Sequence, residues 1–146
     1  MTNEMPKSNT PDQTPPAWPQ RIDPLLKDLL YPSESDEPIE GVTCYLDGEA
    51  PLTGSQIEDW LMLPPSVYVE EGSEDEFWDL PTRQEDWHGD EERERASRFI
   101  ELKKIVEENL TVRQLFRVGD TEIDVYLLGR TADGSRAGLK TKVVET

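Results

Sequence analysis

Clustered carboxylates are the groups in this sequence most able to do chemistry. The four clusters are Glu34 with Asp36 and Glu37, Glu70 with Glu71, Glu74 with Asp75 and Glu76, and Asp90 with Glu91 and Glu92. Closely spaced carboxylate oxygens are ligands that Ca²⁺ and Mg²⁺ accept. No cluster fits the spacing of the known calcium-binding helix–loop–helix loops, so we interpret them as solvated acidic surface. A divalent-cation-binding protein remains an alternative.

The other reactive side chains give no support for catalysis. His88 lies among carboxylates, but it is the only histidine, so a common transition-metal ligand set cannot be completed. Cys44 is the only cysteine and lies in a predicted strand, where a buried thiol is usually inert. The serines lie in no nucleophile-elbow or phosphate-loop pattern. We therefore predict a binding protein, with no cofactor and no intrinsic metal, rather than an enzyme.

The charge balance narrows the class of partner. The chain has 146 residues, with 15 Lys and Arg against 32 Asp and Glu, which gives a formal net charge of −17. Such a surface repels nucleic acid and anionic membranes and attracts basic partners. We find no stretch that resembles a membrane span or a secretory signal. We expect a cytoplasmic protein that is a monomer when free and binds neither nucleic acid nor membrane.

The elements that must position these residues follow from the apolar pattern. Residues 1–20 hold five prolines and few apolar residues, which predicts a disordered extension before a domain at 21–146. Trp18 is the exception, and we expect it to pack on the domain edge. Asp23 and Pro24 are typical of a helix start, and residues 31–40 resemble a loop.

Later segments have clearer periodicity. Alternation or helical spacing predicts strands at 41–47, 67–69, 112–119, 122–130 and 137–146, and helices at 53–63 and 90–110. Residues 70–76 resemble an acidic loop that leads to an apolar patch at Phe77, Trp78 and Leu80. This order predicts an α+β domain with a mainly antiparallel sheet.

Several motifs together resemble one known family. The C-terminal segment EIDVYLLGRTADGSRAGLKTKVVET, at 122–146, resembles the end of the nuclease A inhibitor family. LLYPSESDEP, at 29–38, is similar to that family's Ser-Glu-Ser loop, and EDWHGDEE, at 85–92, is similar to its Asp-Trp loop. Their shared order and spacing carry the resemblance, since each short motif alone is weak.

The resemblance implies a three-layer α/β/α sandwich like that of pathogenesis-related proteins. It also implies inhibition of a sugar-non-specific endonuclease of the ββα-metal type, by covering its Mg²⁺-bearing active site. The family's contact residues correspond here to Glu34, Trp87 and Thr146, with Asp86 before the tryptophan. Glu34 and Thr146 would approach the metal of the bound nuclease, and a closing strand would hold Thr146 in place. The residues alone leave open an acidic interaction module with a non-nuclease partner.

Overall fold

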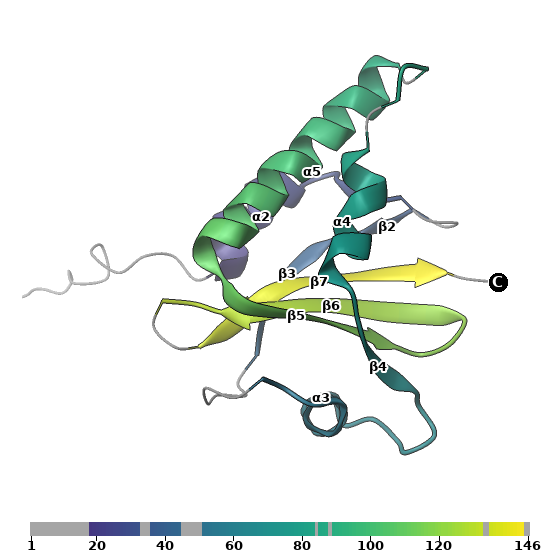
Figure 1. The fold of residues 1–146 in the computed structure, drawn as a ribbon, viewed down its shortest axis with the longest axis vertical. Coiled ribbons are helices and arrows are strands. Elements are labelled where there is room, and N and C mark those ends of the chain that lie inside the picture. Colours follow the sequence, from purple (N-terminus) through teal and green to yellow (C-terminus); the bar gives the residue numbers. More distant parts are fainter. Residues whose placement is uncertain are drawn as a thin grey trace, which may run out of the picture.

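A five-stranded antiparallel sheet forms the middle layer of the protein in its computed structural model (Figure 1). In chain order its strands are β3 (Glu40–Cys44), β4 (Val69–Gly72), β5 (Thr111–Val118), β6 (Glu122–Arg130) and β7 (Arg136–Val144). Their order across the sheet is β3-β7-β6-β5-β4, so the C-terminal meander occupies the centre. The structure describes residues 18–32, 36–44, 51–83, 85–87, 89–132 and 135–144.

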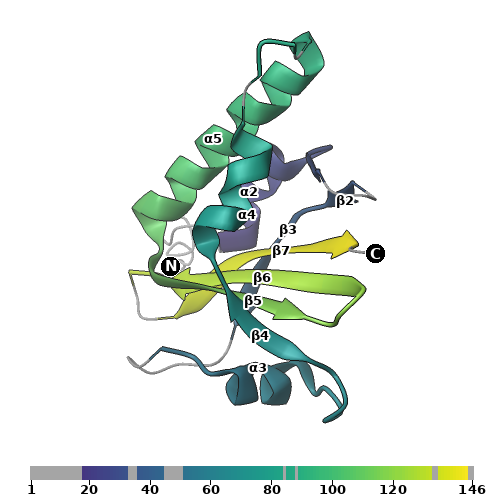
Figure 2. The ribbon, with the colours of Figure 1, turned by 45° about the vertical axis from the view of Figure 1, so that its right-hand side comes forward.

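Helices cover both faces of this sheet. Three of them, α2 (Trp18–Leu26), α4 (Glu74–Thr82) and α5 (Asp90–Asn109), lie over one face, and α3 (Gly54–Leu61) lies over the other (Figure 2). Two short strands, β1 (Leu30–Tyr31) and β2 (Glu37–Pro38), pair with each other beside β7. The predicted α+β fold with an antiparallel sheet between helical layers is confirmed. Its likeness to pathogenesis-related proteins stays a prediction.

The central strands supply two apolar cores, one for each face of the sheet. On β6, Ile123, Val125 and Leu127 belong to the core under α2, α4 and α5. Tyr126 and Leu128 alternate with them and belong to the core over α3. A strand covered on both faces reads as a nearly continuous apolar run, as β6 does from Val125 to Leu128. The predicted buried Cys44 lies in the α3 core.

Two helices form where the local sequence predicts them. Thr53 caps α3 through a capping box, in which its side chain accepts from the Gln56 N–H and Gln56 Oε1 accepts from the Thr53 N–H. The first turn of α5 holds three acids, Asp90, Glu91 and Glu92, which the positive end of the helix dipole stabilises.

Among the helices that the structure describes, none combines the length and the apolar character that a membrane span needs.

Three sequence predictions about the elements are wrong. Residues 70–76 are not a loop, because β4 pairs with β5 there and Ser73 then caps α4 by accepting from the Glu76 N–H at 3.3 Å. Residues 31–40 are not entirely loop, since Tyr31 pairs with Glu37. The first helix does not begin near Asp23: α2 begins at Trp18 and has Pro24 inside it. Residues 1–17 lie outside the described part.

The start of α2 is fixed to the sheet at Gly138. The buried Trp18 indole N–H donates to the Gly138 carbonyl oxygen at 2.7 Å, so Trp18 packs in the core beside the sheet. At Gly138, β7 approaches β6 so closely that a Cβ atom would lie 1.7 Å from the Leu127 carbonyl oxygen. Glycine is therefore required there by the close approach of two backbones.

We expect Gly138→Ala to lower the free energy of unfolding by at least about 3 kcal/mol, because β6 and β7 must separate to admit the methyl group. Urea unfolding measures this change. Gly54→Ala is the matched control, since its Cβ would lie 3.8 Å from the nearest atom. The control should change stability by less than about 1 kcal/mol. Equal unfolding midpoints for the two variants would contradict the close approach.

Candidate functional site

The segment between α4 and α5 carries two of the four predicted contact residues. Asp86 and Trp87 are both exposed, and 76% of Trp87 is accessible to solvent. Glu34, Thr146 and the neighbouring His88 lie outside the described residues. The structure does define β1 and β2, which lie before and after Glu34 in the chain, and β7, which lies before Thr146.

Contacts at both ends hold the Asp86–Trp87 segment. At the end of α4, Arg83 pairs with Asp79 at 2.5 Å and lies 3.9 Å from Glu85, the residue before Asp86. From the first turns of α5, Arg93 donates to the Asp86 carbonyl oxygen at 3.3 Å. The segment is therefore fixed to two helices that themselves pack together.

A depression of about 210 Å³ opens beside Trp87. Its walls come from the end of α4, the connecting segment and the first turns of α5. The lining residues are Leu80, Pro81, Arg83, Glu85, Trp87, Glu92, Arg95 and Ala96. Apolar groups thus form part of the wall and charged groups the rest, the usual composition of a site that orients a partner.

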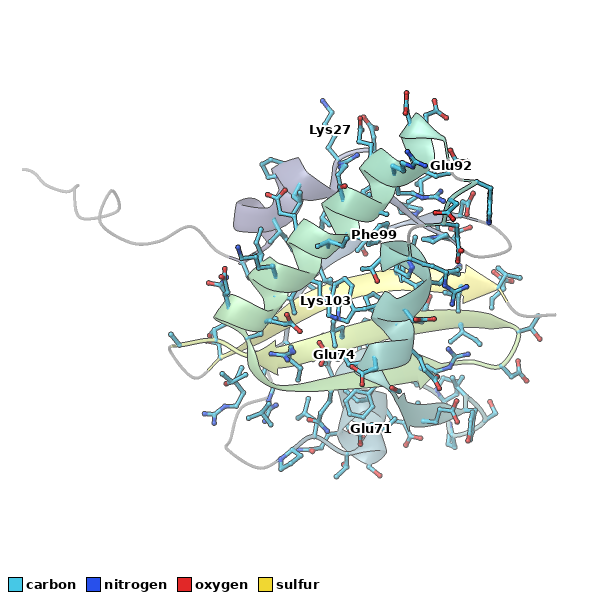
Figure 3. All side chains as sticks on the ribbon, turned by 45° about the horizontal axis from the view of Figure 1, so that its top comes forward. Lys27, Glu71, Glu74, Glu92, Phe99 and Lys103 are labelled. Carbon is cyan, nitrogen blue, oxygen red and sulfur yellow. The ribbon has the colours of Figure 1, made fainter. Side chains whose placement is uncertain are left out.

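A second, more open depression of about 640 Å³ adjoins the first. Both are lined by Glu92 and Arg95, and the second extends over Asp28 and Leu30, at the start of β1. Glu92 lies near the N-terminal end of α5 (Figure 3). One continuous surface therefore runs from Trp87 across α5 to the β1–β2 pair.

Tyr31 attaches β1 to α4. Its ring stacks on Phe77 with centroids 4.9 Å apart, and its hydroxyl donates to the Phe77 carbonyl oxygen at 2.6 Å. In a regular helix that carbonyl would accept from the residue four positions later, which here is Pro81 and has no N–H. The Tyr31 hydroxyl supplies the donor that Pro81 lacks. Tyr31 precedes the segment of Glu34 by three residues, so this contact positions the base of that segment.

Thr141 attaches β7 to β2. Its hydroxyl donates to the Pro38 carbonyl oxygen at 3.0 Å, and it pairs with Val125 inside the sheet. Val144, the last described residue, pairs with Glu122. In both ribbon views, β2 and the C-terminal end of β7 lie on the same side of the molecule (Figures 1 and 2). The strands next to Glu34 and Thr146 are thus joined by a hydrogen bond.

The acidic side chains within the described part of the chain do not gather into a metal site. Among the described residues, no group of three or more His, Cys, Asp or Glu side chains could hold a metal ion. Glu71 and Glu74 lie far from Glu92 (Figure 3). Glu74 instead pairs with Arg113 at 2.8 Å and accepts from the Trp78 indole at 3.2 Å. Glu74 therefore joins α4 to β5 through Arg113.

An exposed tryptophan beside a walled depression, on a strongly acidic chain, defines a surface suited to binding another protein. Residues 18–146 match the family model described as nuclease A inhibitor-like protein, and the chain belongs to this family. The family supports a nuclease-inhibitor function in general, fits a protein that is not an enzyme, and implies a nuclease partner. A comparison with curated protein sequences found no match.

Two site residues were missed from the sequence. The sequence groups Leu80 with Phe77 and Trp78 as one apolar patch. In the structure Leu80 is 48% exposed, whereas Phe77 and Trp78 are buried. Helical spacing alone would not decide this, because Leu80 follows Phe77 by three residues and borders the face that Phe77, Trp78 and Pro81 bury. The sequence predicts a loop at Tyr31, and no sequence pattern signals its contact with Phe77.

Trp87 should contribute little to folding. We expect Trp87→Ala to change the free energy of unfolding by less than about 0.5 kcal/mol, because most of the side chain is already in solvent. Trp78→Ala is the matched control and should cost about 3 to 5 kcal/mol, because Trp78 is fully buried. Chemical denaturation followed by circular dichroism measures both. Comparable losses in the two variants would place Trp87 in the core.

Tyr31 should make stability depend on pH in the alkaline range. Burial raises the pKa of Tyr31 to about 12, with Arg117 lowering it in part and Asp79 adding to the rise. The unfolded chain ionises near the ordinary pKa of 10.0, so the unfolded state binds fewer protons above it. The contribution of neutral Tyr31 is therefore complete below about pH 10 and is lost as pH rises toward 12.

Tyr31→Phe should remove this contribution. We expect the variant to be less stable at pH 7 by about 1 to 2 kcal/mol, because the Phe77 carbonyl loses its donor. Between pH 10 and 12, its stability should fall less steeply than that of the wild type. Denaturant titrations at several pH values measure both effects. Parallel pH profiles would show that Tyr31 ionises normally in the folded protein.

Proposed function

We propose that this protein inhibits a sugar-non-specific, Mg²⁺-dependent endonuclease of the ββα-metal type by covering its active site. Glu34, Asp86, Trp87 and Thr146 are the proposed contact residues. The observation that carries the proposal is the exposure of Trp87 on a segment fixed to two helices, in a chain of the nuclease A inhibitor-like family. Large aromatic side chains of this kind dominate the binding energy of many interfaces.

Hydrogen bonds between the supporting elements favour a shared contact surface. Tyr31 attaches β1 to the helix that precedes Trp87, and Thr141 attaches β7 to β2. The segments of Glu34, Trp87 and Thr146 therefore start from elements that are already joined. Supporting elements that are positioned before binding lower the ordering cost of forming a complex, which favours tight binding.

The negative charge of the chain speeds its encounter with the partner. A nuclease that cleaves any nucleic acid sequence must present a basic groove for phosphates, and a chain of net charge −17 is attracted to it over long range. The Glu34 carboxylate would stand where a phosphate oxygen of the substrate would otherwise bind, near the metal of the nuclease. Occupation of that place by the inhibitor excludes the nucleic acid.

The test is an inhibition titration against a panel of Mg²⁺-dependent ββα-metal nucleases. We expect DNA digestion by at least one member to stop near one-to-one stoichiometry. Glu34→Ala, Trp87→Ala and a few glycines appended after Thr146 should each weaken inhibition about tenfold or more. Glu107→Ala and Tyr68→Ala are matched controls, an exposed acid and a 59% exposed aromatic away from the Trp87 segment, and should inhibit normally.

Other outcomes would replace the proposal. A panel left fully active by excess protein would favour an acidic interaction module with a different partner. Heat released on titrating the free protein with Ca²⁺ or Mg²⁺ would favour a divalent-cation binder. Full inhibition by all three variants would leave an inhibitor with a contact surface elsewhere.

A further inference from the structure

The depression beside Trp87 has a second exposed apolar wall. Leu80 and Trp87 come from different elements, are 48% and 76% exposed, and line the same depression. Large apolar side chains exposed side by side are typical of binding surfaces, whereas single ones are common anywhere. The depression therefore has two exposed apolar side chains in its lining, together with the buried Pro81 and Ala96.

Leu80 is held outward by the packing of its helix. Phe77, Trp78 and Pro81 bury the face of α4 that Leu80 borders, and the Tyr31 hydroxyl and the Thr82 side chain complete the hydrogen bonds of its last turn. These contacts fix the turn that carries Leu80 at the edge of the buried face, where the side chain is 48% exposed. A side chain fixed in this way loses little further entropy when a partner covers it.

Charge around the depression favours a cationic occupant. The depression beside Trp87 is lined by two carboxylates and two arginines, and the adjoining depression adds four carboxylates and one arginine. Arg83 is paired with Asp79 at 2.5 Å and lies 3.9 Å from Glu85, and Arg98 donates to the carbonyl oxygens of Leu25 and Lys27. Arg95 is the remaining cation, and Glu91 and Glu92 precede it by one helical turn, at the spacing of facing side chains.

The geometry points to a lysine or arginine of the partner nuclease as the occupant, held between Leu80 and Trp87. Its methylene stem packs on Leu80 and Pro81, its cationic head meets the Trp87 ring and the Glu92 carboxylate, and Leu80 is thereby a contact residue. This inference rests on the proposed function, since the partner is taken to be the inhibited nuclease. It adds the residue on α4 and the chemistry that Trp87 meets.

The test uses a nuclease that the wild-type protein inhibits and measures affinity by inhibition and by calorimetry. Leu80→Ala should weaken binding about tenfold, whereas Ile100→Ala, a control that is 46% exposed on α5 and lines neither depression, should change it less than about twofold. The Leu80→Ala and Trp87→Ala pair should lose less than the product of the single losses, because both side chains hold one occupant. Thermal melts check that each variant is folded.

Charged variants then identify the occupant. With a cationic occupant, Leu80→Glu should bind at least about tenfold more tightly than Leu80→Lys, and added salt should narrow the difference. Ile100→Glu and Ile100→Lys measure the effect of the same charge change on the long-range attraction. The difference at Leu80 should exceed the difference at Ile100.

Each contrary result has a distinct meaning. Equal affinities of Leu80→Ala and Ile100→Ala for an inhibited nuclease would overturn the docking inference and leave the inhibitor function standing. A Leu80→Lys variant that binds as well as Leu80→Glu would overturn the cationic occupant. A wild-type protein that inhibits no nuclease of the panel would overturn the inhibitor function and, with it, this occupant.

Discussion

The hydrogen bond from the Tyr31 hydroxyl to the Phe77 carbonyl oxygen supports the whole candidate surface. Pro81 cannot donate to that carbonyl, and a buried acceptor without a donor would destabilise the last turn of α4. The same contact anchors β1 and β2, which have two residues each and could not persist as an isolated pair. One side chain thus completes a helix and attaches the strands on either side of Glu34.

The acidic charge of the chain is also placed where the fold tolerates it. Asp90, Glu91 and Glu92 lie in the first turn of α5, where the helix dipole favours negative charge. They also line the larger depression that reaches Leu30 of β1, so residues that stabilise the helix form part of the acidic surface. Elsewhere carboxylates are joined to the structure, as Glu74 is through Arg113 and Trp78. A large net charge is then compatible with a stable fold.

The sequence predicts the elements with strong periodicity and fails where the signal is short. It places β6 at 122–130 as observed, and it places α5 to within one residue, because nine to twenty residues of regular spacing leave little choice. It misses β1 and β2, since two-residue strands have no period. It predicts a loop at 70–76, because the run of acids in β4 and α4 resembles solvated loop and the role of Ser73 as a helix cap is not evident.

For the site, a tryptophan such as Trp87 is common both in cores and at interfaces, so only packing decides its exposure.

Electrostatic attraction alone could not make such a protein selective. A chain of net charge −17 is drawn to many basic surfaces, and long-range attraction raises the rate of encounter more than it distinguishes partners. Discrimination needs short-range fit, in which a wrong partner leaves apolar surface uncovered or a charge buried without a counter-charge. The depression beside Leu80 and Trp87 meets both requirements. Its apolar lining fits the stem of a long side chain, and the carboxylates of the adjoining depression disfavour a negatively charged side chain. Selectivity among basic partners would therefore arise at this depression, and the rest of the acidic surface would set the rate at which they arrive.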